Sequence, residues 1–361
     1  MLKAFGVDEL RSGMKVGRTV QDLDGTVLIR SGTVLKQKDL NKLSGKPVFS
    51  VYIDVPEEEI HTEIVGNEHL LDGKYVQCYK MAYSRVQNIY FKLGREGELD
   101  IPSMEDIIVD NVINELCEGA TSVSQIHNMT RRGDYAIHHA LNLFILAGLM
   151  ANWMRLRWSK KTELMTAAML SDVGKMRVPK EILEKTGKLT PEELDSVKRH
   201  VDYGYDMLKF SVLSAHKDLL MGILQHHERC DGSGYPNRVK GNDICDYGKI
   251  IAILDMYDAM AANRSYAKRN SPFDVLKILY DDMIKGKLDT NFTVMFIKNL
   301  NAALNGNWVG LDNGERAKIV YIDESRIFAF PIVQTTKNEF IDLNRRTDIK
   351  IEALLTANEM E

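Results

Sequence analysis

The sequence places aspartates where buried apolar segments end, and it clusters histidines nearby. Asp172 follows the aliphatic run Ala167–Leu170, and Asp255 follows Ile250–Leu254. A carboxylate in such a place is costly unless it is paired or bound to a metal. The histidines that accompany these two aspartates are His138, His139, His200, His226 and His227. Imidazoles mixed with carboxylates suit Fe, Mn, Zn and similar divalent ions, and one aspartate can bridge two ions about 3.5–4 Å apart, as in the hydrolysis of phosphoesters.

Taken singly, each of these residues also has a purely structural explanation. His139 lies four residues after Tyr135 on one face of a predicted helix, so it could be a core histidine. Asp172-Val-Gly-Lys175 is typical of a helix end, with a glycine cap and a lysine that complements the dipole. His200 could be an exposed helical residue, and Asp231-Gly-Ser-Gly-Tyr-Pro236 contains three turn dipeptides. Only the set as a whole favours a functional site.

The longest motif runs from His226 to Pro236 and reads HHERCDGSGYP, which resembles the HD-GYP family pattern HHE-x-x-DGSGYP. It is followed in family order by Lys249–Ala259 and by Arg264-Ser-Tyr266. Upstream, Asp172–Lys175 is similar to the tail of the family's HD-x-GK, and Tyr135–His139 is similar to the lead-in to its first metal histidine. Because several linked motifs coincide in order, we identify residues 125–300 as similar to HD-GYP cyclic-di-GMP phosphodiesterases.

The resemblance implies a helical bundle that holds two divalent transition-metal ions, such as Fe or Mn. One ion would be bound by His139, Asp172 and Asp255. Asp172 would bridge to a second ion, and that ion would be held by His200, His226 and His227. Water activated by the ions would attack a phosphate of cyclic-di-GMP, giving pGpG and in some members GMP.

The resemblance also assigns catalytic, substrate and partner contacts. Asp172 and Lys175 would be catalytic, with Lys175 offsetting charge on the phosphate. The residues that would bind substrate are Lys175, Tyr235, Arg264 and Tyr266. The loop Gly234–Pro236 is linked in the family to substrate choice and to protein contacts, so a GGDEF-type protein is a candidate partner.

The chain departs from the family pattern at two positions. Ser171 stands where the family has a metal-binding histidine before Asp172. A serine hydroxyl is a poorer ligand, and even outer-shell changes can cost about 10–100-fold in affinity or activity, so we expect one weakened ion site and reduced activity. Tyr135 stands where members with a third ion have glutamate, so we expect no third ion. His138 could replace the missing ligand only in an irregular helix, because adjacent helical residues point about 100° apart.

Three hypotheses follow for the function. The first is a cyclic-di-GMP phosphodiesterase with reduced activity. The second is a degenerate domain that binds the dinucleotide or a protein partner without hydrolysis. The third, another phosphohydrolase of the HD superfamily, fits poorly with the long GYP motif. Ser171 is the residue that distinguishes the first two hypotheses. The retention of so many costly buried polar groups favours metal binding and turnover.

The periodicity predicts a mainly α chain in four segments. Residues 1–56 form a β-rich N-terminal domain, with alternation around a Ser-Gly turn in Gly25–Leu35 and a strand at Val48–Val55. Residues 57–124 form a helical linker region whose first helix ends at Gly94–Gly97. Residues 125–306 form the HD-type helical bundle. Residues 307–361 form a short β extension, with strands expected at Ala317–Ile322, Ile327–Val333 and Ile349–Leu354.

One helix start is specific. Thr190-Pro-Glu-Glu193 combines a threonine cap, a proline at the first helical position and a glutamate at the third. These features define a capping box. The helix that it opens is predicted to run past His200.

Composition limits the class of protein and its partners. The 361 residues exceed one ordinary core. A net charge of −4 without basic runs argues against binding duplex nucleic acid. Four cysteines without a CxxC pair indicate reduced cytosolic thiols. The N-terminus lacks a signal-peptide core, and the apolar stretch Leu141–Met154 is too short to cross a membrane. We therefore expect a soluble cytoplasmic protein, with a homodimer through the linker helix as a further hypothesis.

Overall fold

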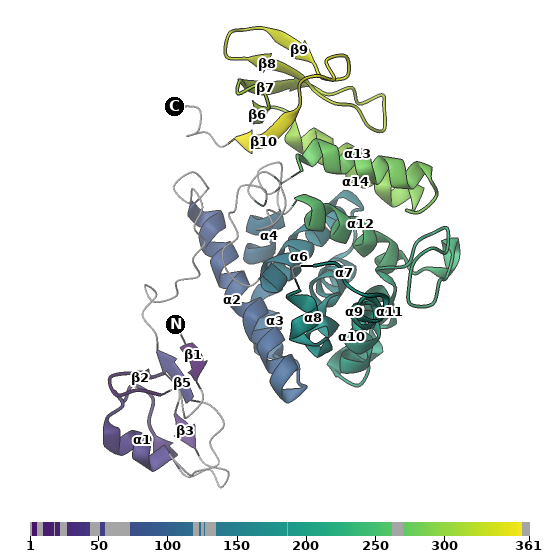
Figure 1. Cartoon of the computed structure of the whole chain (residues 1–361). Coiled ribbons are helices and arrows are strands. Elements are labelled where there is room, and N and C mark those ends of the chain that lie inside the picture. The colour runs from purple at the N-terminus through teal and green to yellow at the C-terminus, as the bar shows by residue number, and fades with distance from the viewer. Residues whose placement is uncertain are drawn as a thin grey trace. The chain divides into compact units, whose positions relative to one another are not determined.

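The computed structural model describes residues 2–5, 10–17, 19–21, 27–43, 51–54, 73–117, 123, 126, 135–185, 187–261 and 270–355. The chain divides into two compact units, residues 1–63 and 64–361 (Figure 1). Arg264, Tyr266 and residues 57–72, where the linker helix was predicted to begin, lie outside the described residues. Among the described residues, no helix combines the length and the hydropathy that a membrane span requires.

The first unit has the predicted β character and, in addition, one helix. Its elements are β1 (Leu2–Phe5), β2 (Lys15–Val16), β3 (Val20–Gln21), β4 (Val27–Ile29), α1 (Gln37–Leu43) and β5 (Val51–Asp54). Antiparallel pairing gives one sheet in the order β1-β5-β2 and a separate β3-β4 pair. Gly32 of the Ser-Gly turn has a φ of 84°, which glycine adopts without steric cost. Beyond that turn Val34 pairs with Lys15.

The first described element of the second unit is α2 (Gly73–Glu96), which packs beside α6. Its buried positions recur every three to four residues, as the sequence pattern predicted. Gly97 follows the helix at a φ of 72°, and its N–H donates to the carbonyl of Leu93 at 3.1 Å. The glycine-rich segment therefore ends the helix as expected.

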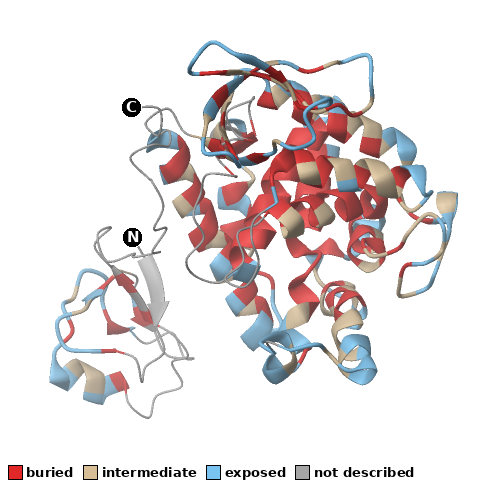
Figure 2. Cartoon of the chain, turned by 45° about the horizontal axis from the view of Figure 1, so that its top comes forward, coloured by how far each residue is buried: buried red, intermediate tan, exposed pale blue. Residues whose placement is uncertain are grey.

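The remaining helices form the bundle and its continuation. They are α3 (Ile101–Ile107), α4 (Asp110–Cys117), α6 (Tyr135–Trp153), α7 (Trp158–Leu170), α8 (Lys180–Leu183), α9 (Pro191–Lys198), α10 (His200–Leu208), α11 (Lys217–Gln225), α12 (Asp246–Ala261), α13 (Pro272–Ile284) and α14 (Thr290–Leu304), with 3-10 turns η4 (Val173–Arg177), η5 (Val212–Ala215) and η6 (Gly241–Asp243). Figure 2 shows that burial is concentrated at the centre of this unit. There α6 and α12 are buried on almost every side, as expected for helices that are apolar around their circumference.

The capping box is confirmed, but the predicted length of its helix is wrong. Thr190 Oγ1 accepts from the Glu193 N–H at 3.3 Å, and Glu193 Oε2 accepts from the Thr190 N–H at 2.7 Å. However, α9 ends at Lys198, and α10 begins at His200 after a backbone change at Arg199, whose ψ is −7°. The reason is packing: α9 buries no residue, whereas α10 must bury His200 in the bundle.

The C-terminal β region is larger than the short extension that was predicted. Its strands are β6 (Trp308–Leu311), β7 (Arg316–Tyr321), β8 (Ile332–Thr335), β9 (Phe340–Asp342) and β10 (Ile351–Leu355). They form an antiparallel sheet in the order β10-β6-β7-β8-β9. The strand predicted at Ile327–Val333 begins only at Ile332. The Asn344 side chain bonds both the N–H and the carbonyl of Phe330, so these backbone groups do not join the sheet.

Candidate metal centre

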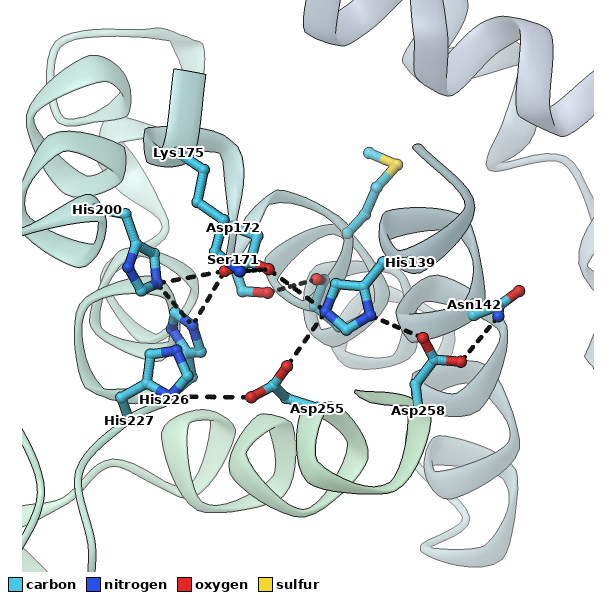
Figure 3. Close-up of polar contacts among 12 residues, drawn as sticks. His139, Asn142, Ser171, Asp172, Lys175, His200, His226, His227, Asp255 and Asp258 are labelled. Carbon is cyan, nitrogen blue, oxygen red and sulfur yellow. Dashed lines mark hydrogen bonds and ion pairs between the residues drawn. The ribbon is translucent and has the colours of Figure 1, made fainter. Parts of the chain in front are cut away.

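Three histidines and one aspartate converge at the centre of the bundle. Their ligand atoms lie within 4.8 Å of one another, and they come from the start of α10 (His200), the end of α11 (His226 and His227) and the end of α7 (Asp172). Asp172 Oδ1 lies 3.2 Å from His200 Nε2 and 3.7 Å from His226 Nε2. The two Nε2 atoms are 3.4 Å apart. We call this group the histidine cluster (Figure 3).

The chemistry of the histidine cluster fits a cation. His200 Nδ1 lies 2.7 Å from the carbonyl of Val197, and His226 Nδ1 lies 2.7 Å from the carbonyl of Ile223. A carbonyl only accepts, so each Nδ1 carries a proton, and Nε2, which faces the cluster, is the nitrogen that can bind a metal. Two such nitrogens and a carboxylate oxygen at these distances suit a positive ion between them.

A second group, which we call the aspartate cluster, contains His139, Asp172 and Asp255, again with ligand atoms within 4.8 Å. His139 Nε2 of α6 lies 3.1 Å from Asp255 Oδ1 of α12 and 3.3 Å from Asp172 Oδ2. Its Nδ1 faces a further carboxylate, Asp258 Oδ2, at 2.7 Å. Asp172 therefore directs one oxygen to each cluster, as Figure 3 shows.

The electrostatics of the two clusters also favour a bound cation. Burial opposes charge on His139, but its bonds to three aspartates outweigh burial and raise its pKa well above the usual histidine value. Burial likewise opposes ionisation of Asp172, yet Lys175 and the surrounding histidines lower its pKa well below the usual range. Burial and the neighbouring His226 lower the pKa of His227, which keeps this imidazole in the neutral form that binds metals.

Gly174 explains why Asp172 and His200 meet. A Cβ at Gly174 would lie 1.9 Å from the His200 carbonyl oxygen and 2.4 Å from the Gly204 nitrogen. Only a residue without a side chain lets η4 touch the backbone of α10. The glycine of the Asp172–Lys175 motif is thus required for close approach, and it sets the position of Asp172 against His200.

Ser171 and Lys175 flank Asp172 in the chain. Ser171 is fully buried as the C-cap residue that follows α7, and its Oγ donates to the Ala168 carbonyl at 2.8 Å. Lys175 donates to Asp172 Oδ2 at 2.5 Å, and its side chain is one-third exposed. Lys175 therefore provides a positive charge at the edge of the centre that solvent reaches.

The GYP loop lies against the histidine cluster. The Tyr235 ring stacks on the His227 ring with centroids 4.7 Å apart. Burial, followed by the charges of Asp172 and Asp255, raises the pKa of Tyr235, so its hydroxyl stays protonated. The buried Glu228 holds the loop, because its Oε1 accepts from the Asn237 N–H at 2.7 Å.

Two further polar residues of this region were not assigned a role from the sequence. Asp258 bonds His139, and Asn142 Nδ2 donates to Asp258 Oδ1 at 2.8 Å. The signal was present, since Asp258 lies three residues after Asp255 and so shares its helix face. His138 faces away, as expected, because its ring contacts Tyr79 and Tyr83 of α2.

Comparison with known proteins identifies the family. Residues 107–291, just over half of the chain, match the family model described as the HD domain. The chain belongs to the HD domain family. The match includes the six residues that form the histidine and aspartate clusters, which are consistent with the binuclear metal site of an HD domain.

The relatives of this HD domain protein include curated phosphodiesterases. It is 27% identical to a cyclic di-GMP phosphodiesterase of Pseudomonas aeruginosa, covering 92% of this chain and 85% of the relative. It is 32% identical to the cyclic di-GMP phosphodiesterase of Thermotoga maritima, covering 55% of this chain and 51% of the relative. It is 39% identical to the 3'3'-cGAMP-specific phosphodiesterase 2 of Vibrio cholerae over 36% of this chain, which spans only 24% of that relative.

A solved structure supports the fold. An HDG"Y"P protein from Bdellovibrio bacteriovorus superposes with a TM-score of 0.51 at 17% identity, covering 82% of this HD domain protein and 98% of the other chain. At that identity the likeness concerns the arrangement of the elements alone. The prediction of an HD-type helical bundle with a C-terminal β region agrees with it.

Proposed function

We propose that this HD domain protein hydrolyses cyclic-di-GMP to pGpG, with a rate reduced by Ser171. The observation that carries the proposal is the convergence of imidazole Nε2 atoms on the two oxygens of Asp172. Such a centre serves phosphodiester hydrolysis, and the curated relatives are cyclic dinucleotide phosphodiesterases. The relative that matches over most of both chains is named for cyclic di-GMP, which favours that substrate.

In this proposal the two clusters hold two divalent transition-metal ions, Fe, Mn or similar. The aspartate cluster would bind one ion and the histidine cluster the other, with Asp172 shared. When bound, the ions would lower the pKa of water, so that a nucleophile exists at neutral pH, and they would neutralise phosphate charge. The protein's own contribution is to fix the ligand orientations and to keep the centre buried.

Other residues would position the substrate around this centre. Lys175 is one-third exposed beside Asp172, so its ammonium can meet a phosphate oxygen and offset developing charge. Tyr235 presents a ring next to the histidine cluster, where it would border the bound phosphate or a base. Arg264 and Tyr266 are proposed from the sequence alone to hold the dinucleotide.

The proposed loss of rate rests on the side chain of Ser171. Its hydroxyl is bonded to the Ala168 carbonyl of its own helix, and a hydroxyl is in any case a poorer ligand than imidazole. The aspartate cluster therefore keeps a single imidazole, His139. The second candidate function, a degenerate domain that binds cyclic-di-GMP without cutting it, is favoured by this one residue.

The deciding experiment measures metal and product on the same protein. Purified full-length chain would be loaded with Mn, Fe or Ni, its metal content determined, and cyclic-di-GMP turnover to pGpG followed by chromatography. We expect slow turnover that is lost in Asp172→Ala. Binding of the dinucleotide without turnover under all three metals would establish the sensor function instead.

Ser171→His tests the cause of the slow rate. We expect the substitution to raise both metal content and turnover. If it raises neither, then residue 171 does not face the metal.

Partners are a separate part of the proposal. The GYP loop, with Glu228 fixing its backbone, is proposed as the contact for a GGDEF-type protein, and the helical linker as a homodimer contact. Sedimentation of the chain, alone and with such a protein, tests both.

A further inference from the structure

A line of buried hydrogen bonds connects α2 to the proposed metal ligand His139. Tyr79 of α2 donates its hydroxyl to Asn142 Oδ1 at 3.0 Å. Asn142 Nδ2 donates to Asp258 Oδ1 at 2.8 Å, and the other carboxylate oxygen of Asp258 lies 2.7 Å from His139 Nδ1. Figure 3 shows the last two links. All four side chains are at most 3% exposed.

The donors and acceptors along this line have one consistent direction. A carboxylate only accepts, so His139 Nδ1–H and the Asn142 amide must both donate to Asp258. The amide oxygen of Asn142 then faces Tyr79, which donates its one proton there, so the same hydroxyl accepts from His138 Nδ1 at 3.1 Å. The line thereby fixes the orientation of the His139 ring, with Nε2 directed at Asp172 and Asp255.

We propose that Tyr79 is a positioning residue for His139, acting through Asn142 and Asp258, and that α2 thereby controls how well the aspartate cluster binds its ion. The proposal rests on the metal role proposed above for His139. The position of α2 in the chain gives this control a possible use. It is the first described helix after the N-terminal unit, so a change in the segment before the bundle would act on α2 first. A change in α2 would reach the metal through a single imidazole.

A neighbouring tyrosine shows that α2 does not need this arrangement to satisfy a hydroxyl. Tyr90, eleven residues further along α2 and also buried, donates its hydroxyl to the backbone carbonyl of Met169 at 2.7 Å. Tyr79 is bonded instead to side chains that end at a proposed ligand. The aspartate cluster is also the one with a single imidazole, so the orientation of His139 has a large effect on it.

The test compares Tyr79→Phe with Tyr90→Phe in the full chain. Each variant loses one buried hydroxyl of the same helix, and the melting temperature of the metal-free protein measures how much stability each loses. Mn²⁺ binding is then measured by titration, and His139→Ala identifies which of the two binding events belongs to the aspartate cluster. We expect Tyr79→Phe to weaken that event alone, by about 3- to 10-fold, somewhat less than a direct outer-shell change. Tyr90→Phe should leave it unchanged.

Equal Mn²⁺ affinities in the two tyrosine variants would overturn the proposal, since the hydroxyl would then be structural only. Asp258→Asn provides a second variant of nearly the same shape, with an expected loss of about 10- to 100-fold at the same ion. Unchanged affinity there would overturn the proposal as well. A different failure, in which His139→Ala loses no ion at all, would instead contradict the metal role of His139 and hence the proposed function.

Discussion

The two halves of the centre are held in different ways. In the histidine cluster, His200 and His226 are fixed by backbone carbonyls three residues earlier in the chain. In the aspartate cluster, His139 is fixed by Asp258, which is 119 residues away in sequence. The first anchoring is local and cannot be removed by changing a side chain. The second depends on the packing of separate helices, so substitutions far from the aspartate cluster can change the position of His139.

The shared residue should give the largest effect. Asp172→Ala removes a ligand from both clusters, so both Mn²⁺ binding events should weaken and turnover should fall by more than about 100-fold, beyond what outer-shell changes cause. Titration with Mn²⁺ and product analysis measure this. If one event kept its full affinity, Asp172 would belong to only one cluster.

Asp258→Ala addresses the difference in anchoring directly. It removes the anchor of His139 and leaves the backbone anchors of the histidine cluster in place. The aspartate-cluster ion should bind about 10- to 100-fold more weakly, with the other ion unchanged. A matched loss at both ions would mean that the two halves are not held independently.

Gly174→Ala tests the histidine cluster, whose anchoring is local. The new Cβ would overlap the His200 carbonyl and must displace α10. Overpacking of this kind costs about 1–3 kcal/mol of stability. The displacement of α10 should also weaken Mn²⁺ binding at the histidine cluster. Urea unfolding and Mn²⁺ titration measure the two effects. Gly187→Ala is the control, because Gly187 has open space around its Cβ position.

Thr190→Ala should have the smallest effect. It removes the cap of α9, which costs about 1 kcal/mol of stability. The carbonyl that anchors His200 lies in the last turn of α9, far from the cap, so Mn²⁺ binding should not change. Weaker binding would show that the local anchor depends on the whole of α9.

The sequence predicted half of the cluster residues from contiguous motifs, because Asp172–Lys175 and His226–Pro236 are recognisable as units. His139, His200 and Asp255 stand in separate segments and were assigned through the family resemblance. The line from Tyr79 to Asp258 was not predicted, because hydrogen bonds between helices depend on rotations that no local pattern encodes. The helix break at Arg199 was not predicted for a similar reason. The residues of the segment favour a helix throughout, and we attribute the position of the break to the burial of His200.

The β regions show the same limit. The strand predicted at Ile327–Val333 overlaps β8 only at Ile332 and Val333. The pattern could not show that the Asn344 side chain would bond the backbone of Phe330, so that the strand starts later. The helix α1 was missed because its seven residues are too few to show a clear period.

The contact at Gly174 has a mechanical consequence. The peptide groups of η4 and α10 touch directly, so the spacing between the carriers of Asp172 and His200 is set by atomic radii rather than by side chains that can repack. A substitution elsewhere in the core can be accommodated by side chains that repack, whereas this backbone contact contains no side chain that could do so. The separation of Asp172 and His200 therefore has little room to shrink.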